Sequence, residues 1–242
     1  MSKAVVPISG GLDSSVILSL AAGVHDEIYA LTYDYGQKHS KEILYAGMQI
    51  DNYDNIEEHK VIDISFFKDI APTSSLTNNN IKVAHARDVL GDAQTVNYVP
   101  FRNMMMLSIA CSYAEAVGAE TVYHGSALVD SQAGYWDGSK EFLTEINNVT
   151  ALNRKTKVKI EAPLIKLSKQ EIIDTGVKNN VKFEDTWTCY EGGEKACGYC
   201  TACSSRIQGF LQNGLVDPIE YERDDIPWQA GCHGHPSNWK TT

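Results

Sequence analysis

The sequence predicts an α/β fold, with a doubly wound, mostly parallel β-sheet followed by a small C-terminal metal-binding subdomain of helix and loop. Short apolar runs alternate with helix-like stretches, a glycine-rich turn directly follows the first apolar run, and four of the six cysteines fall within residues 189–203. Alternating strands and helices favour a parallel sheet with helices on both faces, which binds ligands at the carboxyl ends of its strands. We place the boundary between the two parts after residue 184, giving segments 1–184 and 185–242.

The composition limits the class of protein. The chain has 242 residues, is 43% hydrophobic and carries a net charge of −10. It has no surplus of Lys and Arg to neutralise a long stretch of nucleic-acid phosphates. No apolar run approaches the roughly 18 residues of a membrane span, and the amino terminus has no apolar stretch of the kind found in secretory signals. We expect a cytoplasmic protein that binds neither membrane nor nucleic acid directly.

The first half of the chain alternates between strand and helix patterns. Apolar runs predict strands, and the stretches between them have helical character. The predicted strands are residues 4–8, 27–33 and 59–64, and the predicted helices are residues 16–22 and 40–52.

The second half begins with an irregular segment. Residues 71–95 are rich in Ser, Thr and Asn and have weak periodicity, so they form either an active-site lid or a plain surface loop. The elements predicted after this segment are an apolar helix at residues 101–117 that contains Cys111 in its core face, strands at 121–124 and 160–164, and a helix at 168–175 that begins with a capping box.

The turn after the first strand has the residues of a phosphate-binding loop. Adjacent glycines let the backbone N–H groups point inward, and the amino end of the following helix attracts anions. A carboxylate beside phosphates needs a bridging cation, so Asp13 predicts Mg²⁺ between itself and a polyphosphate. The alternative is an ordinary glycine-rich turn with an Asp or Ser helix cap. The expected nucleotide-binding residues are Ile8, Ser9, Gly10, Gly11, Leu12, Asp13, Ser14 and Ser15.

Four cysteines have the spacing of a structural zinc site. Cys189, Cys197, Cys200 and Cys203 include two consecutive Cys-x-x-Cys steps, and four thiolates complete a tetrahedral shell with no open position. A redox dithiol or accidental clustering is the alternative. The run from Cys232 to His235 forms either a second metal half-site or a surface tail.

Several motifs together resemble the 7-cyano-7-deazaguanine synthase family of the ATP pyrophosphatase (PP-loop) superfamily. They are SGGLDSS at 9–15, YGQKH at 35–39, VPFRN at 99–103, the stretch 125–142, APL at 162–164 with LSK at 167–169, and WTCY at 187–190 followed by CGYCTAC at 197–203. The resemblance implies an adenine nucleotide alpha hydrolase-like fold, ATP with Mg²⁺, and one structural Zn²⁺ per chain. It also implies conversion of 7-carboxy-7-deazaguanine and ammonia to 7-cyano-7-deazaguanine through two adenylations, by a homodimeric ligase.

The resemblance and the residue types give candidate roles. Lys38, Arg102 and Lys166 are cations at predicted loop or strand-end positions, although each could also be a solvated surface charge. Carboxylates accept hydrogen bonds from a guanine-like edge, and aromatic rings stack on it. We expect Asp13, Ser14, Lys38 and Arg102 to be catalytic, Gly36, Gln37 and Gly125 to help bind nucleotide, and the substrate to contact Arg102, Asp130, Tyr135, Asp137 and Lys166.

Two stretches depart from the pattern of that family. Phe101 replaces a usual glycine, and Trp136, Gly138 and Ser139 stand where the family carries Pro, Cys and Arg. We expect both stretches to converge on one pocket and to change a substrate contact, with Lys140 or Arg154 as the replacement cation. Three other functions stay open: a variant that stops at the amide or uses another amine, a tRNA-modifying enzyme of the same superfamily, and a nucleotide-binding regulatory module without catalysis.

Overall fold

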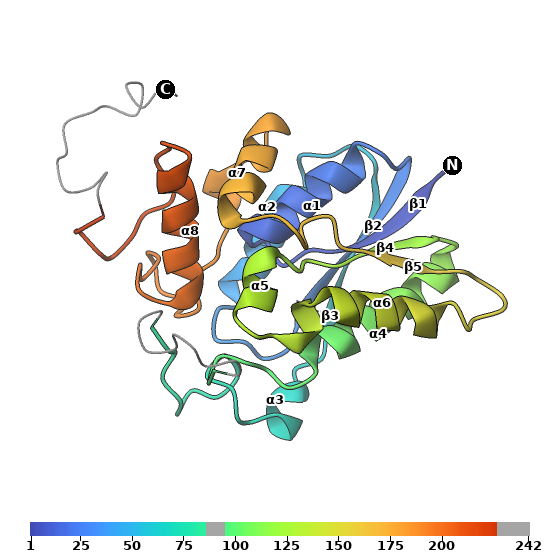
Figure 1. The fold of residues 1–242 in the computed structure, drawn as a ribbon, viewed down its shortest axis with the longest axis horizontal. Coiled ribbons are helices and arrows are strands. Elements are labelled where there is room, and N and C mark those ends of the chain that lie inside the picture. The colour runs from blue at the N-terminus through green and yellow to red at the C-terminus, as the bar shows by residue number, and fades with distance from the viewer. Residues whose placement is uncertain (86–94, 227–242) are drawn as a thin grey trace.

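The computed structural model describes residues 1–85 and 95–226, and its centre is a five-stranded sheet (Figure 1). The strands are β1 (Lys3–Pro7), β2 (Glu27–Asp34), β3 (Ile56–Asp63), β4 (Thr121–Tyr123) and β5 (Lys159–Glu161), and every pairing is parallel. Their spatial order is β3-β2-β1-β4-β5. The strand order therefore reverses between β1 and β4, where a parallel sheet leaves a crevice for ligands.

Helices cover both faces of the sheet, as the sequence predicts. On one face lie α1 (Leu12–Ala22), α2 (Lys41–Ile50) and α7 (Lys169–Lys178), and on the other α4 (Arg102–Val117) and α6 (Lys140–Thr150). β1 shows how the sequence divides between these layers. Ala4 and Val6 belong to the core under α1, whereas Val5 packs with α4, because successive strand residues point to opposite faces. The doubly wound α/β prediction is confirmed.

Short helices complete the connections. They are α3 (Phe67–Ile70), α5 (Leu128–Gln132) and two 3-10 turns, η2 (Trp136–Gly138) and η3 (Phe183–Asp185). Within the described parts of the chain, no helix is both long and apolar enough to cross a bilayer.

Several predicted boundaries were wrong, and α7 ends at Lys178 rather than at residue 175. The first helix begins at Leu12 rather than residue 16, so Asp13 lies in its first turn. The third strand begins at Ile56, three residues earlier than predicted. The last strand ends at Glu161, because Pro163 lacks the N–H group that would continue the ladder.

The C-terminal part packs at the carboxyl edge of the sheet. Helix α8 (Thr201–Gln212) lies beside α7 in Figure 1, and a third core cluster joins the four cysteines to Trp187 and Ile207. Val83, from the segment before residue 86, is also buried in this cluster. Residues 86–94 of the predicted lid and the Cys232–His235 run lie outside the described residues. The division at residue 184 stays a prediction.

Candidate active site and metal centre

The loop after β1 has a backbone that only glycine can adopt at position 10. Gly10 has φ of +78°, and a Cβ atom there would lie 2.3 Å from the carbonyl oxygen of Glu42. The next residue, Gly11, is the N-cap of α1, and no side chain caps that helix end. The first-turn N–H groups of α1 are thus free of a side-chain cap, which is the arrangement that binds an anion. Neither Asp13 nor a serine serves as the cap that the alternative interpretation requires.

Serine hydroxyls stabilise this loop from within. Ser14 Oγ accepts from the Ser9 N–H at 3.2 Å and donates to the Gly11 carbonyl at 3.0 Å. Ser15 Oγ donates to the same carbonyl at 2.9 Å. Ser9 is exposed at the mouth of the loop, whereas Ser14 and Ser15 are buried below it. The hydroxyls therefore fix the loop, and that of Ser9 lies 3.1 Å from Ser14 Oγ.

Asp13 has a cationic partner that the sequence analysis missed. Lys169 Nζ, from the first residue of α7, donates to the two carboxylate oxygens of Asp13 at 2.6 and 2.7 Å. The Lys169 side chain is 13% exposed. The two residues are 156 positions apart, so spacing gave no signal. An ammonium group thus neutralises the carboxylate for which we expected Mg²⁺.

The loop after β2 is braced by Gln37. Its Oε1 accepts from the Tyr35 N–H at 2.8 Å, and its Nε2 donates to the Tyr33 carbonyl and to Glu42 Oε1 at 3.1 and 3.2 Å. Gly36 makes the turn with φ of +75°. Gln37 is buried, so it holds the loop in shape, and its predicted contact with nucleotide stays a prediction. Lys38, beside it, donates from Nζ to the Ile81 carbonyl at 2.7 Å.

Arg102 lies at the amino end of α4 against this loop. Its Nη1 donates to the Tyr35 hydroxyl at 3.3 Å, and its guanidinium lies 5.4 Å from the centre of the Tyr35 ring. Burial raises the pKa of Glu42 to about 8, although the Arg102 charge opposes the rise. Burial lowers the pKa of His39 to about 3, and Arg102 lowers it further. The pair of His39 Nε2 and Glu42 Oε2, 3.4 Å apart, therefore holds a neutral imidazole beside a carboxyl group that titrates near neutrality.

Two aspartates lie beyond β4. Asp130 Oδ2 accepts from the Ala127 N–H at 2.8 Å, and burial raises its pKa to about 6, with Asp13 and Asp137 adding to the rise. Asp137 is buried and hydrogen-bonded to Asn103 at the start of α4, and burial raises its pKa against the opposing charge of Arg102. Asp130 interacts electrostatically with Asp13 and Asp137, and Asp137 interacts with Arg102. The four residues therefore lie around one site at the carboxyl edge of the sheet.

The remaining predicted residues lie around this site with fewer contacts. Gly125 is exposed just after β4, and Lys166 is exposed after β5. The Tyr135 hydroxyl lies 3.2 Å from Thr95 Oγ1, and its ring stacks on Tyr98. Sequence reasoning missed Tyr190, whose ring packs against His39 with ring centres 5.6 Å apart. The charges of Arg102 and Asp130 also act on the pKa of its hydroxyl. Its signals in the sequence were its place beside Cys189 and in the WTCY motif at 187–190.

The two altered stretches meet, as predicted. The Phe101 ring lies 5.2 Å from that of Trp136, whose Nε1 donates to the Tyr98 hydroxyl at 2.8 Å. Phe101 has φ of +54°, a left-handed conformation that glycine adopts more readily than a residue with a side chain. Gly138 allows close packing, since a Cβ there would lie 2.6 Å from Asp130 Cβ. Ser139 accepts from the Phe142 N–H at 3.0 Å and so caps α6.

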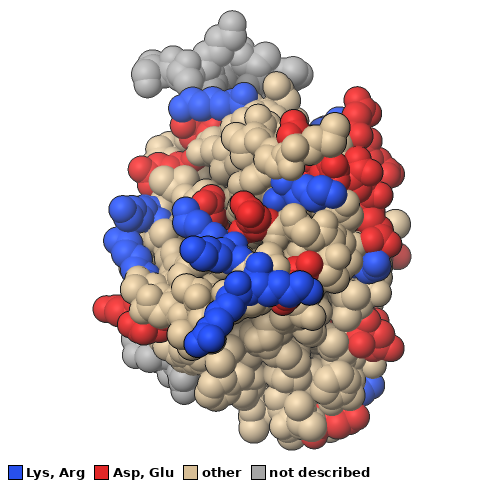
Figure 2. Space-filling model, turned by 90° about the vertical axis from the view of Figure 1, so that its right-hand side faces the viewer, with Lys and Arg blue, Asp and Glu red and all other residues tan. Residues whose placement is uncertain are grey.

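Arg154 is excluded as the replacement cation. It lies between α6 and β5, at the edge where β5 begins, whereas the site lies where the strands end. Figure 2 shows the side of the molecule where the N-terminus lies, with Lys and Arg side chains gathered across the middle and acidic ones along a flank. Lys140, the first residue of α6, is exposed at the carboxyl edge of the sheet, where the site lies.

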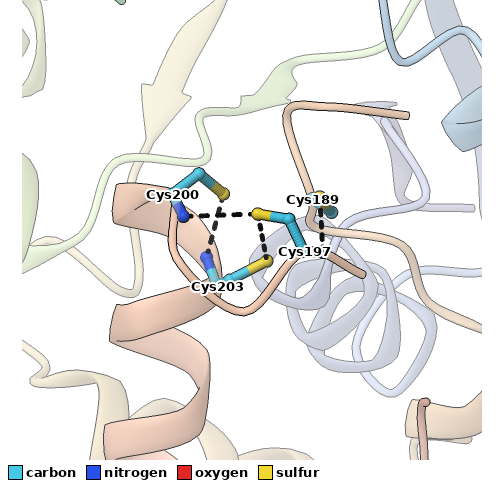
Figure 3. A group of neighbouring side chains, drawn as sticks. All are labelled: Cys189, Cys197, Cys200 and Cys203. Carbon is cyan, nitrogen blue, oxygen red and sulfur yellow. Dashed lines mark hydrogen bonds between the residues drawn. The ribbon is translucent and has the colours of Figure 1, made fainter. Parts of the chain in front are cut away.

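The four cysteines form one compact group (Figure 3). Their Sγ atoms all lie within 4.8 Å of one another, and all four residues are buried. Backbone N–H groups of Cys197, Cys200 and Cys203 donate to sulfur atoms within the group at 3.2–3.4 Å, which stabilises thiolates. This set fits one tetrahedral ion. A four-iron cluster fits less well because its cysteine sulfurs bind four different irons and lie farther apart.

Known proteins with similar sequences support the same picture. The family model described as "Queuosine biosynthesis protein QueC" matches residues 3–214. The chain belongs to this family. A 7-cyano-7-deazaguanine synthase from Oceanobacillus iheyensis is 42% identical over 90% of this chain and 98% of its own length. One from Thermoplasma volcanium is 40% identical over 91% of each chain.

Solved structures match more distantly. The NMN synthetase from Francisella tularensis aligns with a TM-score of 0.48 at 15% identity, covering all of this chain and 87% of its own. The U34-tRNA thiolase NcsA from Methanococcus maripaludis, solved with its [4Fe-4S] cluster, has the same score and identity and covers 97% of this chain and 82% of its own.

Proposed function

We propose that this enzyme converts 7-carboxy-7-deazaguanine and ammonia into 7-cyano-7-deazaguanine with ATP. The observation that carries the proposal is membership of the QueC family over residues 3–214, with relatives named for this synthase. The intact loop at residues 9–15 supports the use of ATP. Because the reaction joins nitrogen to carbon at the expense of ATP, the enzyme is a C–N bond-forming ligase.

The reaction removes both oxygens of the substrate carboxylate by transferring each of them to an AMP leaving group. The carboxylate attacks the α-phosphorus of ATP and releases pyrophosphate, and ammonia then displaces AMP to give the amide. The amide oxygen attacks a second ATP, again releasing pyrophosphate, and loss of AMP with a proton leaves the nitrile. Each oxygen thus departs as part of AMP, and the protein contributes orientation and charge stabilisation.

The site residues have separate tasks in this proposal. The uncapped N–H groups of α1, with Ser9, Ser14 and the surrounding loop, hold the phosphates. Mg²⁺, held by Asp13, would neutralise the pyrophosphate that leaves. Lys169 supplies a second positive charge beside Asp13. Lys38 keeps two N–H donors beyond its bond to the Ile81 carbonyl, so it can also contact phosphate.

The heterocycle binds beside the second set of residues. We assign its carboxylate to Arg102 and Lys166, its guanine-like edge to Asp130 and Asp137, and its ring face to Tyr135. Each carboxyl group also accepts a hydrogen bond within the protein, Asp130 from the Ala127 N–H and Asp137 from Asn103. The four cysteines hold one structural zinc ion per chain, which metal analysis would test as a stoichiometry of about one.

The proposed partners are small molecules. A net charge of −10 supports the absence of a direct nucleic-acid contact. We infer a homodimer in the cytoplasm, and sedimentation equilibrium would test the dimer.

A variant that stops at the amide is the second candidate. The contact between Phe101 and Trp136 and the capping role of Ser139 favour it, because they change this part of the pocket from the pattern of the resembled family. Mass spectrometry of the product from 7-carboxy-7-deazaguanine, Mg-ATP and ammonium separates the two. A nitrile supports the synthase, an amide that is not consumed supports the variant, and an absence of ATP–pyrophosphate exchange contradicts both.

A further inference from the structure

Trp187 connects the metal-binding segment to the phosphate loop. Its backbone N–H donates to the carbonyl of Gly10 at 2.8 Å, and Cys189, the first metal ligand, follows two residues later. Trp187 is 3% exposed. A short, buried hydrogen bond therefore joins the two sites directly.

The hydrogen bond fixes the peptide between Gly10 and Gly11. In a trans peptide the carbonyl and the following N–H point in opposite directions. With the Gly10 carbonyl held by Trp187, the Gly11 N–H points away from the metal segment, where it donates to Ser9 Oγ at 3.2 Å. That N–H and that hydroxyl lie at the exposed mouth of the loop. Trp187 therefore determines how this part of the loop faces a phosphate.

The side chain of Trp187 is itself held by the metal-binding segment. Its Nε1 donates to the carbonyl of Cys189 at 3.0 Å. The Lys41 ammonium lies 4.0 Å from the ring centre, and Tyr45 packs beside the ring at 5.8 Å. The indole is thus fixed by a metal ligand on one side and by α2 on the other.

Residues on both sides of Trp187 are clamped to α8. Arg206 donates to Thr186 Oγ1 at 2.7 Å and to Thr188 Oγ1 at 3.1 Å. Arg206 lies in the same helix as Cys203, one turn further on. The cysteine segment also packs closely against the loop after β2, because a Cβ at Gly192 would lie 2.9 Å from the Lys38 carbonyl. Movement of the cysteine segment would consequently displace both loops of the candidate active site.

We propose that Trp187 is a positioning residue through which the metal centre orients the Gly10–Gly11 peptide, so that metal binding and nucleotide binding stabilise each other. The proposal rests on the proposed use of ATP. Thermodynamic linkage makes the effect reciprocal: if bound metal improves nucleotide affinity, bound nucleotide strengthens metal binding by the same factor. Local packing without coupling would leave the two affinities independent.

The test uses the zinc-loaded full chain. The equilibrium transfer of zinc to 4-(2-pyridylazo)resorcinol is measured by absorbance, with and without saturating magnesium and α,β-methylene ATP, and calorimetry verifies that the analogue binds. We expect the analogue to raise the affinity for zinc about tenfold, within the usual range of allosteric coupling. This measurement needs no variant, so it does not depend on a substitution that fails to fold.

Two variants then locate the coupling. Trp187→Phe keeps the backbone N–H that bonds to Gly10 but removes the indole N–H bond to the Cys189 carbonyl, which ties residue 187 to the metal segment. We expect it to retain about one zinc per chain while the effect of the analogue falls below about twofold. Trp136→Phe is the matched control. It loses an indole N–H bond of similar length, to the Tyr98 hydroxyl, outside the metal segment, and should keep the tenfold effect.

Each contrary outcome has a distinct meaning. A zinc affinity that is unchanged by a bound analogue overturns the coupling and leaves the proposed function standing. A full effect in Trp187→Phe overturns the role of the Trp187 indole in the coupling. A wild-type protein that binds no analogue overturns the coupling together with the proposed use of ATP.

Discussion

Asp13 is the residue on which the nucleotide assignment depends most directly. Its carboxylate lies in the first turn of α1, where it weakens binding of an anion unless a cation is present, and Lys169 supplies one such charge. We expect Asp13→Asn to lower ATP–pyrophosphate exchange at least about 100-fold, the effect of losing one charged contact in the transition state.

The Asp13 substitution should leave the fold intact. The pair with Lys169 is partly exposed, with 32% of the Asp13 side chain accessible, so its loss should cost no more than about 1 kcal/mol of unfolding free energy. Urea denaturation measures that change. Exchange at the wild-type rate in the variant would contradict the assignment.

Glu42 gives a prediction about pH. Burial raises its pKa in the folded protein to about 8, against 4.5 when exposed, so the folded state retains a proton that the unfolded state releases. Its contribution to stability is present below pH 4.5 and is lost as the pH rises to about 8. The groups that act on its carboxyl are Arg102, His39 and Gln37.

The test compares wild type with Glu42→Gln between pH 6.5 and pH 8. Over this span of 1.5 pH units, wild type should lose about 1.6 kcal/mol more unfolding free energy than the variant, because the folded-state carboxyl is half ionised at pH 8. The interval avoids His39, whose lowered pKa has the opposite effect and acts only below its ordinary value of 6.5. If the unfolding free energies of wild type and Glu42→Gln, measured in urea, change in parallel between pH 6.5 and pH 8, then Glu42 is ionised throughout.

At the scale of elements, the entry into α4 carries backbone strain. Phe101 adopts φ of +54°, which costs a residue with a Cβ about 1–2 kcal/mol and glycine almost nothing. Both Phe101→Gly and Phe101→Ala lose the contact with Trp136, so their difference isolates the backbone. We expect the glycine variant to be about 1 kcal/mol more stable in urea, after its greater loss of entropy. A more stable alanine variant would contradict the left-handed conformation.

Helix α8 is held by a buried ion pair. Arg206 donates to both carboxylate oxygens of Asp217 at 2.6 and 2.8 Å, and the two side chains are 1% and 0% exposed. Arg206→Met leaves a buried unpaired carboxylate and should lower the unfolding free energy by about 3–5 kcal/mol. Arg206→Met combined with Asp217→Leu should recover part of the loss. A double variant no more stable than the single one would show that the charges are not the cause.

Local sequence predicted elements well and contacts between distant residues poorly. The predicted 101–117 helix matches α4 within one residue, because Gly118 ends it in a left-handed conformation. The start of α1 was missed because the sequence from Leu12 to Ser15 is typical of a loop. In the structure Ser15 Oγ donates to the Gly11 carbonyl and these residues are helical. Lys169, Trp187 and Tyr190 were missed as site residues because α7 and the cysteine segment reach the first loop only through tertiary packing.

The whole molecule places these pieces around the crevice between β1 and β4. The phosphate loop follows β1, the two aspartates follow β4, and α4 and the metal segment close the sides. A parallel sheet brings all of these loops to the same edge, which is why the predicted convergence of Phe101 and Trp136 is found. The same geometry removes Arg154 from the site, since the residues before β5 lie at the opposite edge.

The identity of the substrate follows from which cations remain at that edge. Ser139 is used as the cap of α6 and Gly138 as a close contact of Asp130, so neither restores the arginine that the family resemblance implies. Arg102 and Lys166 remain as the cations assigned to the carboxylate, and Lys140 is a flexible, exposed side chain. One fixed cation fewer costs a bound carboxylate about 1.5–3 kcal/mol, or roughly ten- to a hundredfold in affinity.

We therefore expect the enzyme to bind the neutral amide of 7-deazaguanine more tightly than the carboxylate. Calorimetry with both ligands measures the preference, and Lys140→Ala should weaken carboxylate binding alone if Lys140 compensates. Arg154→Ala is the matched control, and it should change neither affinity because Arg154 lies at the far edge of the sheet. If the carboxylate binds more tightly than the amide, and Lys140→Ala leaves it so, then the turn at Trp136–Gly138 does not contact the carboxylate. The substitutions there would then be neutral for substrate recognition, and Arg102 would carry that contact.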